Sequence, residues 1–551
     1  MNSVLQKCSF ILLLAAAAAS SPIQAASSKL PGPLFDGLGS HQHKVTTSSK
    51  QAQRYFNQGL TLCFAFNHKE AIRSFRSAAQ LDPSCAMAWW GVAYAYGPHV
   101  NKPMSADENA EAWKALQQMI ALQANASPKE RAYINALSKR YEEKFTEDHS
   151  ALDKAYAAGM RELVKQFPDD LDAQAMFAEA LMDTMPWDYW AKDRSPKPET
   201  EEAIAALRFV LARNPDHPGA THFYIHAVEA GPTPELGIPS ADRLGRFAPQ
   251  AGHLVHMPSH IYLRVGQYHD ATVANERAVK ADQSYLRHCK AQGFYPGAYY
   301  PHNLHFLWYA LMFEGRSAEA LATANKTAAY ANENYCGPRK AVEAPRLRHL
   351  PWITWARFGK WDEILKVAQP PATNDFLIDR VMWHFTRGLA FAARNDAEAA
   401  TREHGELAKL ATSDEAKKLD SPQFPATGIL VVADHWLAGK VAAARGKHAD
   451  AITHLEKAVA AEDALPYMEP AYWPFPARPA LGVVLLQAGQ TERAEQVFRE
   501  DIKRWPRNGW GLHGLEQSLR AQGRTQAAED VRRQLTETWK RADGPLDLAW
   551  F

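Results

Sequence analysis

The sequence predicts an all-α solenoid in which antiparallel helix pairs stack along one axis. Small residues, aromatic residues and a proline recur at intervals of about 34 residues between residues 50 and 541, which is a spacing typical of helical repeats. The composition, with 46% hydrophobic and 22% charged residues, is that of a folded protein with a core. No GxSxG or phosphate-binding loop indicates an α/β enzyme fold.

The clearest repeat unit begins at Ala52. Its signature residues are Tyr55, Gly59, Leu62, Ala71, Phe75, Ala78 and Pro83, at positions 4, 8, 11, 20, 24, 27 and 32 of the unit. This pattern resembles the tetratricopeptide repeat, and looser copies follow at residues 439–458 and 481–506. The resemblance implies a tetratricopeptide-type α-solenoid of about ten to twelve helix pairs, each packed on its neighbours.

The N-terminal residues 1–25 are predicted to be a secretory signal peptide. Lys7 supplies the positive charge, residues 10–19 form an apolar run that is too short to span a bilayer, and Ala25 precedes the cleavage position. The mature chain is therefore expected to be periplasmic or secreted.

Two further segments flank the repeats. Residues 26–49 are rich in Ser, Thr, Pro and Gly, and we expect a flexible linker in which His41 and His43 face solvent. Residues 542–551 are expected to form a C-terminal tail beyond the solenoid of residues 50–541.

The charge balance excludes two classes of partner. The 62 basic and 61 acidic residues give no excess charge for binding nucleic acid or an anionic membrane. No stretch after the signal segment is apolar over 18 residues, so we expect no membrane span.

The cysteines predict one disulfide bond. Cys289 precedes a predicted helix at residues 301–313 and Cys336 follows its antiparallel partner, so both should lie at the same end of one hairpin, within bonding distance. Cys63 and Cys85 are expected at opposite ends of neighbouring helices, and therefore reduced.

Histidines concentrate between residues 221 and 305, which hold nine of the 22. Residues three, four and seven apart share one face of a helix, and three predicted helices each carry such a stripe. The stripes are His222 and His226 with Glu229, then His253, His256 and His260, then His302 and His305.

The repeat resemblance places these stripes in one groove. In tetratricopeptide arrays, positions 2, 5, 9 and 12 of each unit line the concave face, and every stripe histidine takes such a position when the units are aligned on their small residues and prolines. A fourth unit puts Arg346 and His349 at positions 2 and 5. Pro258 lies within the middle stripe, where it predicts a kink or a helix start.

The chemistry of imidazole favours a metal site in this groove. Neutral imidazole is a common transition-metal ligand, and histidines four apart on a helix chelate one ion. We expect zinc or another divalent transition metal. The candidate ligands are His222, His226, Glu229, His253, His256, His260, His302 and His305. A polar groove for an organic or peptide ligand and a structural hydrogen-bond network are the alternatives.

Other residues are candidates for contact with an organic ligand. They are Arg346, His349, Trp308 and Tyr262. The aromatic residues Trp187 to Trp190 lie in an insertion between helices, where they are candidates for a lid over the groove.

Two classes of function follow. The first is a scaffold that binds a peptide, a protein, a small molecule or a metal in its groove. The second is a metal-dependent hydrolase or oxidoreductase, in which Glu229 would be a ligand, a partner of a ligand, or a general base. No residue can be assigned a catalytic role from the sequence.

The segment at residues 256–260, His-Met-Pro-Ser-His, carries a second resemblance. It is similar to a motif of exported bacterial tetratricopeptide proteins, and the similarity extends over most of the chain. This resemblance implies the fold and an extracytoplasmic location, and it implies no chemistry.

The signal peptide leads to a direct prediction. Protein isolated from its native host should begin near Ala26, because cleavage after Ala25 removes residues 1–25. Intact-mass spectrometry checks this, and a chain that still begins with Met1 would contradict it.

Overall fold

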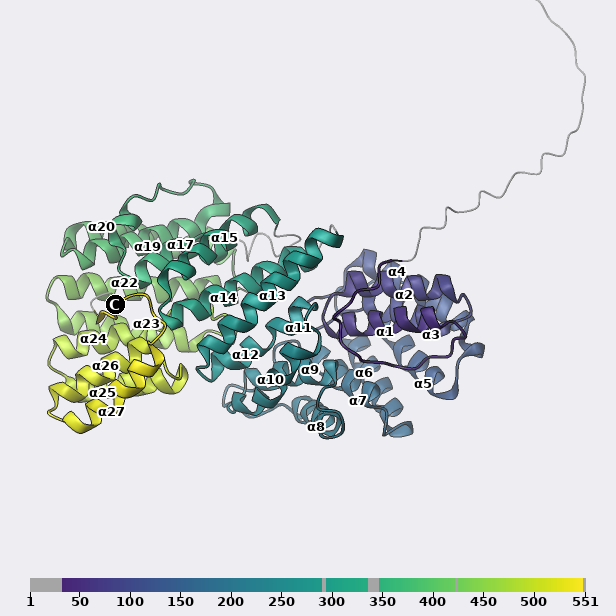
Figure 1. The fold of residues 1–551 in the computed structure, drawn as a ribbon. Helices are drawn as coiled ribbons and strands as arrows, with labels where there is room; N and C mark the ends of the chain where they lie inside the picture. The colour runs from purple at the N-terminus through teal and green to yellow at the C-terminus, as the bar shows by residue number, and fades with distance from the viewer. Residues whose placement is uncertain (1–31, 290–293, 335–345, 422–423, 549–551) are drawn as a thin grey trace, which may run out of the picture.

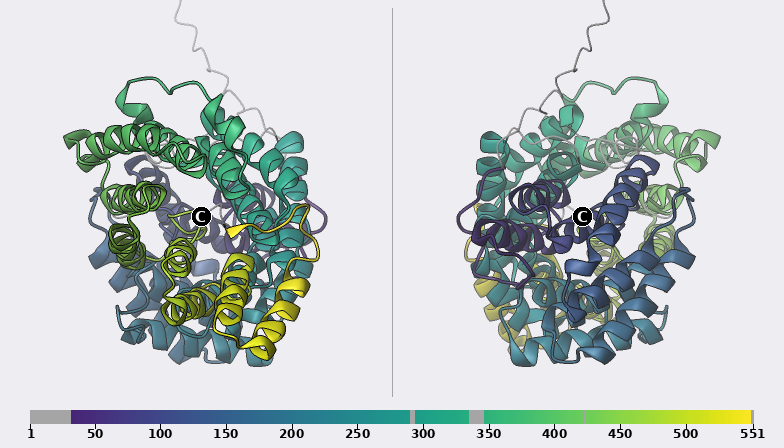
Figure 2. Two further views of the ribbon diagram at one scale, coloured as in Figure 1. Left: turned by 90° about the vertical axis from the view of Figure 1, so that its left-hand side faces the viewer. Right: turned by 90° about the vertical axis from the view of Figure 1, so that its right-hand side faces the viewer.

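The structure is a computed structural model that describes residues 32–289, 294–334, 346–421 and 424–548. These residues fold into successive antiparallel helices, and β-structure among them is limited to isolated bridges. The predicted α-solenoid is therefore confirmed, and its helix pairs wind around a common axis (Figure 1, Figure 2). The predicted signal peptide, residues 1–25, lies outside the described residues.

The helices follow one another with short connections. The first half comprises α1 (Lys50–Phe64), α2 (His68–Leu81), α3 (Ala86–Tyr96), α4 (Ala106–Ala121), α5 (Pro128–Leu137), α6 (Ser150–Gln166), α7 (Leu171–Asp183), α8 (Pro198–Arg213), α9 (Pro218–Glu229), α10 (Ile238–Phe247), α11 (Gly252–His256) and α12 (Pro258–Arg264). The second half comprises α13 (Tyr268–Cys289), α14 (Tyr300–Glu314), α15 (Ser317–Asn334), α17 (Leu350–Arg357), α18 (Trp361–Leu365), α19 (Leu377–Ala393), α20 (Ala397–Ala411), α21 (Asp414–Lys417), α22 (Ala426–Ala444), α23 (His448–Ala464), α24 (Arg478–Gln487), α25 (Thr491–Arg504), α26 (Gly509–Ala521) and α27 (Thr525–Thr538).

Glycine–phenylalanine contacts explain the spacing of the repeat. A Cβ atom on Gly59 or Gly91 would lie 2.7 Å or 2.4 Å from the ring of Phe75. Near the C-terminus, Gly514 packs in the same way against Phe498. Larger side chains at these glycines would clash with the ring, so the small residues set how closely the helices approach.

The segment predicted as a flexible linker is instead packed against the first repeats from residue 32 onward. The Gly32 amide donates to Ser77 Oγ at 2.9 Å, and the Phe35 amide donates to Gln58 Oε1 at 2.7 Å. His43, which was expected to face solvent, is 5% exposed. The high Ser, Thr, Pro and Gly content reflects an extended chain that satisfies its backbone through side chains of α1 and α2.

One buried carboxylate anchors this segment. Asp172, on α7, contacts His41 Nε2 at 2.9 Å, His43 Nδ1 at 2.7 Å and His217 Nε2 at 3.1 Å. Burial opposes the charge of Asp172, but the hydrogen bonds from His217, His41 and His43 hold its pKa well below the usual range. Each histidine donates to the same carboxylate, so this cluster is satisfied without a ligand.

The C-terminal end closes back on the middle of the chain. Asp543 accepts from the amides of Ser317 and Ala318 at 3.0 and 2.8 Å, so it caps the N-terminus of α15. The Tyr268 hydroxyl donates to Pro506 O at 2.8 Å. The predicted tail is thus docked on the solenoid as far as residue 548.

Two hydrophobic cores meet in the middle of the molecule. The first extends through Ile261 and Tyr299, and the second begins at Leu263 and Tyr300. Helices α9, α11 and α12 lie at this junction (Figure 1). The histidine stripes therefore lie where the two halves of the solenoid pack together.

The cysteines lie as follows. Cys63 and Cys85 are buried and unbridged. Cys289 is unbridged in the described part of the chain, and its Sγ lies 3.9 Å from Arg73 Nη2. Its predicted partner, Cys336, lies outside the described residues, so their pairing stays a prediction.

The Asp172 cluster can be tested by mutation. We expect Asp172→Ala to destabilise the N-terminal half by about 3–5 kcal/mol, because it leaves buried histidines without their acceptor. The contribution should be full above about pH 4 and should disappear as acid protonates Asp172 through its lowered folded pKa. Thermal melting, with trypsin cleavage at Lys44 as a second readout, measures the effect. The control is the exposed Asp169→Ala, and equal melting of the two variants would contradict the assignment.

Candidate metal centre

Helix α9 positions the first two histidines. His217 caps this helix, because its Nδ1 accepts from the Ala220 amide at 3.1 Å, and Pro218 occupies the first turn. A Cβ atom on Gly219 would lie 2.7 Å from the ring of Phe64, so only glycine lets α9 lie this close to the end of α1. This close approach brings the Phe64 carbonyl to His222.

Three histidines form the first group. His222 and His226 extend from successive turns of α9, with their Nε2 atoms 3.1 Å apart, and His253 of α11 joins them. One ligand nitrogen from each of the three lies within 4.8 Å of the others. Neither ring nitrogen of the buried His253 has a hydrogen-bond partner among the described residues.

Three more histidines form the second group. His256 ends α11 and His260 lies on α12, after the break that Pro258 introduces as predicted. Their Nε2 atoms are 2.9 Å apart, and His302 of α14 completes the group within 4.8 Å. A π-helical turn at residues 295–299 leads into α14, and such turns are frequent at functional sites.

The carboxylate of Glu229 joins the two groups. Its Oε1 lies 2.6 Å from His226 Nδ1, and its Oε2 lies 2.6 Å from His260 Nδ1. Burial opposes its charge, but His260 and His226 hold the pKa of Glu229 below its usual range. Tyr467 donates to the same Oε2 at 3.0 Å. Glu229 therefore fixes the orientation of one ring in each group.

Hydrogen bonds determine the protonated nitrogen in the first pair. His222 Nδ1 lies 2.6 Å from Phe64 O, which can only accept, and His226 Nδ1 faces the ionised Glu229. Both Nδ1 atoms therefore carry a proton. Burial, opposed by Glu229 only at His226, lowers the pKa of both rings, so both are neutral. Their two Nε2 lone pairs consequently face each other across 3.1 Å.

The second pair has the same orientation. Asn275 Nδ2 donates to Ala271 O, so its Oδ1 faces His256 Nδ1 at 2.7 Å and accepts from it. Burial lowers the pKa of His256 well below its usual range. Burial also opposes the charge of His260, but Glu229 raises its pKa to about 9. A proton on His260 Nε2 would satisfy the second contact, as would a metal ion.

The nitrogen separations fit coordination of one ion by each pair. Two nitrogens at about 2.0–2.1 Å from an ion lie about 2.9 Å apart at a right angle and about 3.3 Å apart at the tetrahedral angle. The observed 3.1 Å and 2.9 Å lie in this range. Each histidine with a bonded Nδ1 also has the outer partner that orients metal-bound imidazoles.

The structure corrects the expected position of two candidate ligands. His302, not its neighbour His305, completes the second group, while His305 stacks on Trp308 with 5.5 Å between ring centroids. The face of α14 that meets the site is one turn earlier than the repeat alignment indicates, because the π-helical turn precedes it. Glu229 lies between the groups as a hydrogen-bond acceptor rather than at their edge.

The expected ligand-contact residues separate into two sets. Arg346 and His349 line a small cavity of about 30 Å³ beside His305. Trp308 is fully buried and donates to Thr354 Oγ1 at 2.7 Å, and Tyr262 donates to Asp242 at 2.7 Å. These two aromatic residues therefore serve packing, as their surroundings on the helices require.

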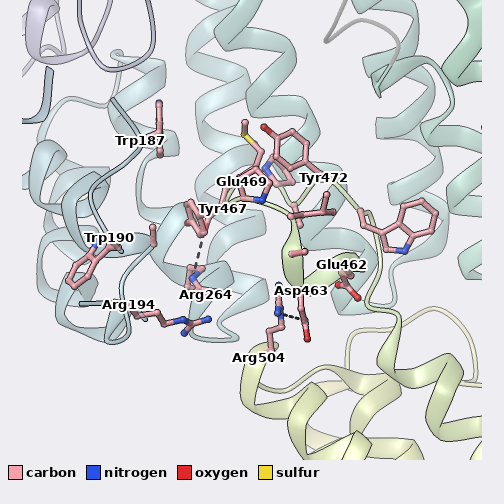
Figure 3. Close-up of a pocket in the computed structure, with 18 of the residues that line it drawn as sticks. Trp187, Trp190, Arg194, Arg264, Glu462, Asp463, Tyr467, Glu469, Tyr472 and Arg504 are labelled. Carbon is pink, nitrogen blue, oxygen red and sulfur yellow. Dashed lines mark hydrogen bonds and ion pairs between the residues drawn. The ribbon is translucent and has the colours of Figure 1, made fainter. Parts of the chain in front are cut away.

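Two cavities adjoin the histidines. A chamber of about 130 Å³ is lined by His226, His253, His260 and His302. A larger cavity of about 720 Å³ lies next to it (Figure 3). Trp187, from the insertion predicted as a lid, lines both cavities and meets the His226 ring edge-on, with 5.2 Å between centroids.

Sequence reasoning missed three residues around the site. Tyr467 and Glu469 reach it from the loop after α23, and Glu469 Oε2 lies 3.3 Å from His260 Nδ1. Phe66 packs on His222 with 4.5 Å between centroids. Tyr467 is 238 residues from Glu229 in the sequence and carries no spacing signal, so only the closed superhelix brings them together.

The comparisons with known proteins give distant likenesses. No family model and no curated protein matches the chain. Similar solved structures include the human IFIT1 dimer with m7Gppp-AAAA, at 11% identity over 90% of this chain and 91% of that chain, with a TM-score of 0.30. Others are the APC/C hetero-tetramer Cut9–Hcn1 (14%, 90% and 76%, TM-score 0.31) and yeast Tom70 (14%, 88% and 90%, TM-score 0.26).

The class of protein is thus a tetratricopeptide-type α-solenoid with a buried histidine chamber. The helix pairs of the structure itself define this class. At such low TM-scores the solved structures carry no argument about ligand or activity. No helix among the described residues is long and apolar enough to cross a bilayer.

Proposed function

We propose that this solenoid binds two transition-metal ions, one at each histidine group. The observation that carries the proposal is the first group. Two neutral imidazoles face each other through Nε2 at 3.1 Å, and the nearby His253 ring has no hydrogen-bond partner in the described chain. A cation between these nitrogens converts a repulsion of lone pairs into ligand bonds, and it also satisfies His253.

The donor atoms favour particular metals. Each group offers imidazole nitrogens alone, whereas calcium and magnesium require oxygen ligands. Imidazole suits zinc, copper, iron and nickel, and three-histidine sites with an open position are known for zinc. We therefore propose zinc or copper as the resident ions. If residues 1–25 direct export, the centre acquires its metal outside the cytoplasm.

A metal-dependent enzyme is the second candidate function. The observation that favours it over a closed storage site is the 130 Å³ chamber, onto which histidines of both groups open. Three protein ligands with a free position facing a cavity are typical of catalytic metal sites, whereas structural sites are closed by four. X-ray absorption spectroscopy should then show an oxygen ligand besides the nitrogens. Coordination by nitrogen alone would favour the binding scaffold.

The metal content provides the first test. We expect the mature protein, loaded with zinc or copper and desalted, to retain two ions per chain in elemental analysis. His302→Ala should lower this content to one, because it removes a ligand of the second group only. His305→Ala, one turn further along α14, is the matched control and should retain two. A wild-type chain that retains no metal, or equal losses in the two variants, would contradict the proposal.

The role of Glu229 provides the second test. Glutamine offers one oxygen, so Glu229→Gln leaves either His226 or His260 without its acceptor. We expect the affinity for metal to fall about 10–100-fold, as for other partners of metal-bound histidines. Competition titration against a chromophoric chelator measures it. Glu235→Gln, on an exposed turn, should bind like the wild type, and an unchanged affinity of Glu229→Gln would refute the role of this carboxylate.

A further inference from the structure

We propose that the 720 Å³ cavity binds an organic oxyanion with an aromatic or otherwise flat body, and holds it beside the histidine chamber. The ligand class is inferred from the walls of the cavity. Its role as a substrate or co-ligand of the metals rests on the proposed function, but its binding does not. The cavity is large enough for one small organic molecule.

Four separate parts of the chain form the cavity. They are the insertion between α7 and α8, the end of α12, the loop between α23 and α24, and the end of α25. Figure 3 shows Trp187, Trp190, Tyr467 and Tyr472 around the space. Aromatic walls of this kind contact flat apolar groups well.

The acidic residues of the cavity already have partners. Asp463 binds Arg478 at 2.9 and 2.6 Å and also pairs with Arg504. Glu462 accepts from the Ala477 amide at 2.8 Å, and Tyr467 donates to Glu469. These carboxylates are therefore engaged within the protein.

The basic residues are less well balanced. The side chain of Arg194 makes no hydrogen bond or ion pair with another described residue. Arg264 uses its Nε to bind the Glu229 carbonyl, and its nearest carboxylate oxygen, on Glu469, is 4.0 Å away. Figure 3 shows the Arg194 and Arg264 guanidinium groups on the same side of the space. Burial, followed by the charges of Arg264 and Arg504, lowers the pKa of Arg194, as expected for cations held close together.

Backbone conformation supports a built site. Arg194 has a φ of 65° and Trp187 a φ of 63°, in the left-handed region that non-glycine residues seldom adopt. Both belong to the insertion and both line the cavity. Phe66, beside the histidines, has a φ of 53°. Unfavourable conformations of this kind concentrate at functional sites, where surrounding contacts impose them.

The cavity and the histidine chamber are neighbours. Trp187, Met468 and Glu469 line both spaces, so little more than these side chains separates them. An anion held between Arg194 and Arg264 would place its body against the aromatic wall and toward this boundary. Guanidinium groups bind carboxylates and phosphates through paired hydrogen bonds, so both ligand sources share the chemistry proposed here.

Tryptophan fluorescence tests the proposal, because Trp187, Trp190, Trp473 and Trp505 line the cavity. The full mature chain, as purified, is titrated with benzoate, with its neutral analogue benzamide, and with inorganic phosphate. We expect saturable binding of benzoate at least about tenfold tighter than that of benzamide, because only benzoate pairs with a guanidinium. Saturable binding of phosphate instead would support the anion site and assign it to phosphate.

Matched variants complete the test. Arg194→Gln should weaken anion binding about tenfold or more, and Arg499→Gln, on the outer face of α25, should leave it unchanged. His302→Ala should still bind the anion, so failure of the metal proposal and of this one are distinguishable. Equal binding of benzoate and benzamide with no binding of phosphate would overturn the proposal without any variant. So would an unchanged affinity in Arg194→Gln.

Discussion

The central interaction is the pair of hydrogen bonds that Glu229 makes with His226 and His260. This carboxylate is fully buried, and both contacts measure 2.6 Å. Because an ionised carboxylate only accepts, it places the proton of each ring on Nδ1 and turns each Nε2 inward. Phe64 and Asn275 act in the same way on the other two rings. Four imidazoles are thus oriented as ligands by groups outside the chamber.

The repeat architecture makes this arrangement possible. Each helix pair buries its own apolar face, so the junction of the two cores can hold polar side chains without loss of either core. Helix α9 approaches α1 closely at Gly219, and the Pro258 break lets His256 and His260 lie on consecutive short helices. The closing of the chain by Asp543 on α15 helps hold the second half against the first.

Much of the site could be predicted from the sequence, because repeat position determines which face a residue occupies. The period placed His222, His226, His256 and His260 in the groove correctly. It misplaced His305, since a π-helical turn changes the phase of α14 and the sequence carries no clear sign of it. The loop with Tyr467 and Glu469, and the packing of residues 32–49, depend on long-range contacts. Such contacts leave no periodic signal, so composition alone suggested a linker.

A crystal structure with anomalous diffraction at the zinc or copper absorption edge tests the account most directly. The account predicts two anomalous peaks in the chamber, each about 2.0–2.2 Å from nitrogens of one histidine group, with the Nδ1 bonds to Glu229 preserved. Metal-loaded crystals with no peak in the chamber would contradict it. A peak bound by His305 in place of His302 would contradict it equally.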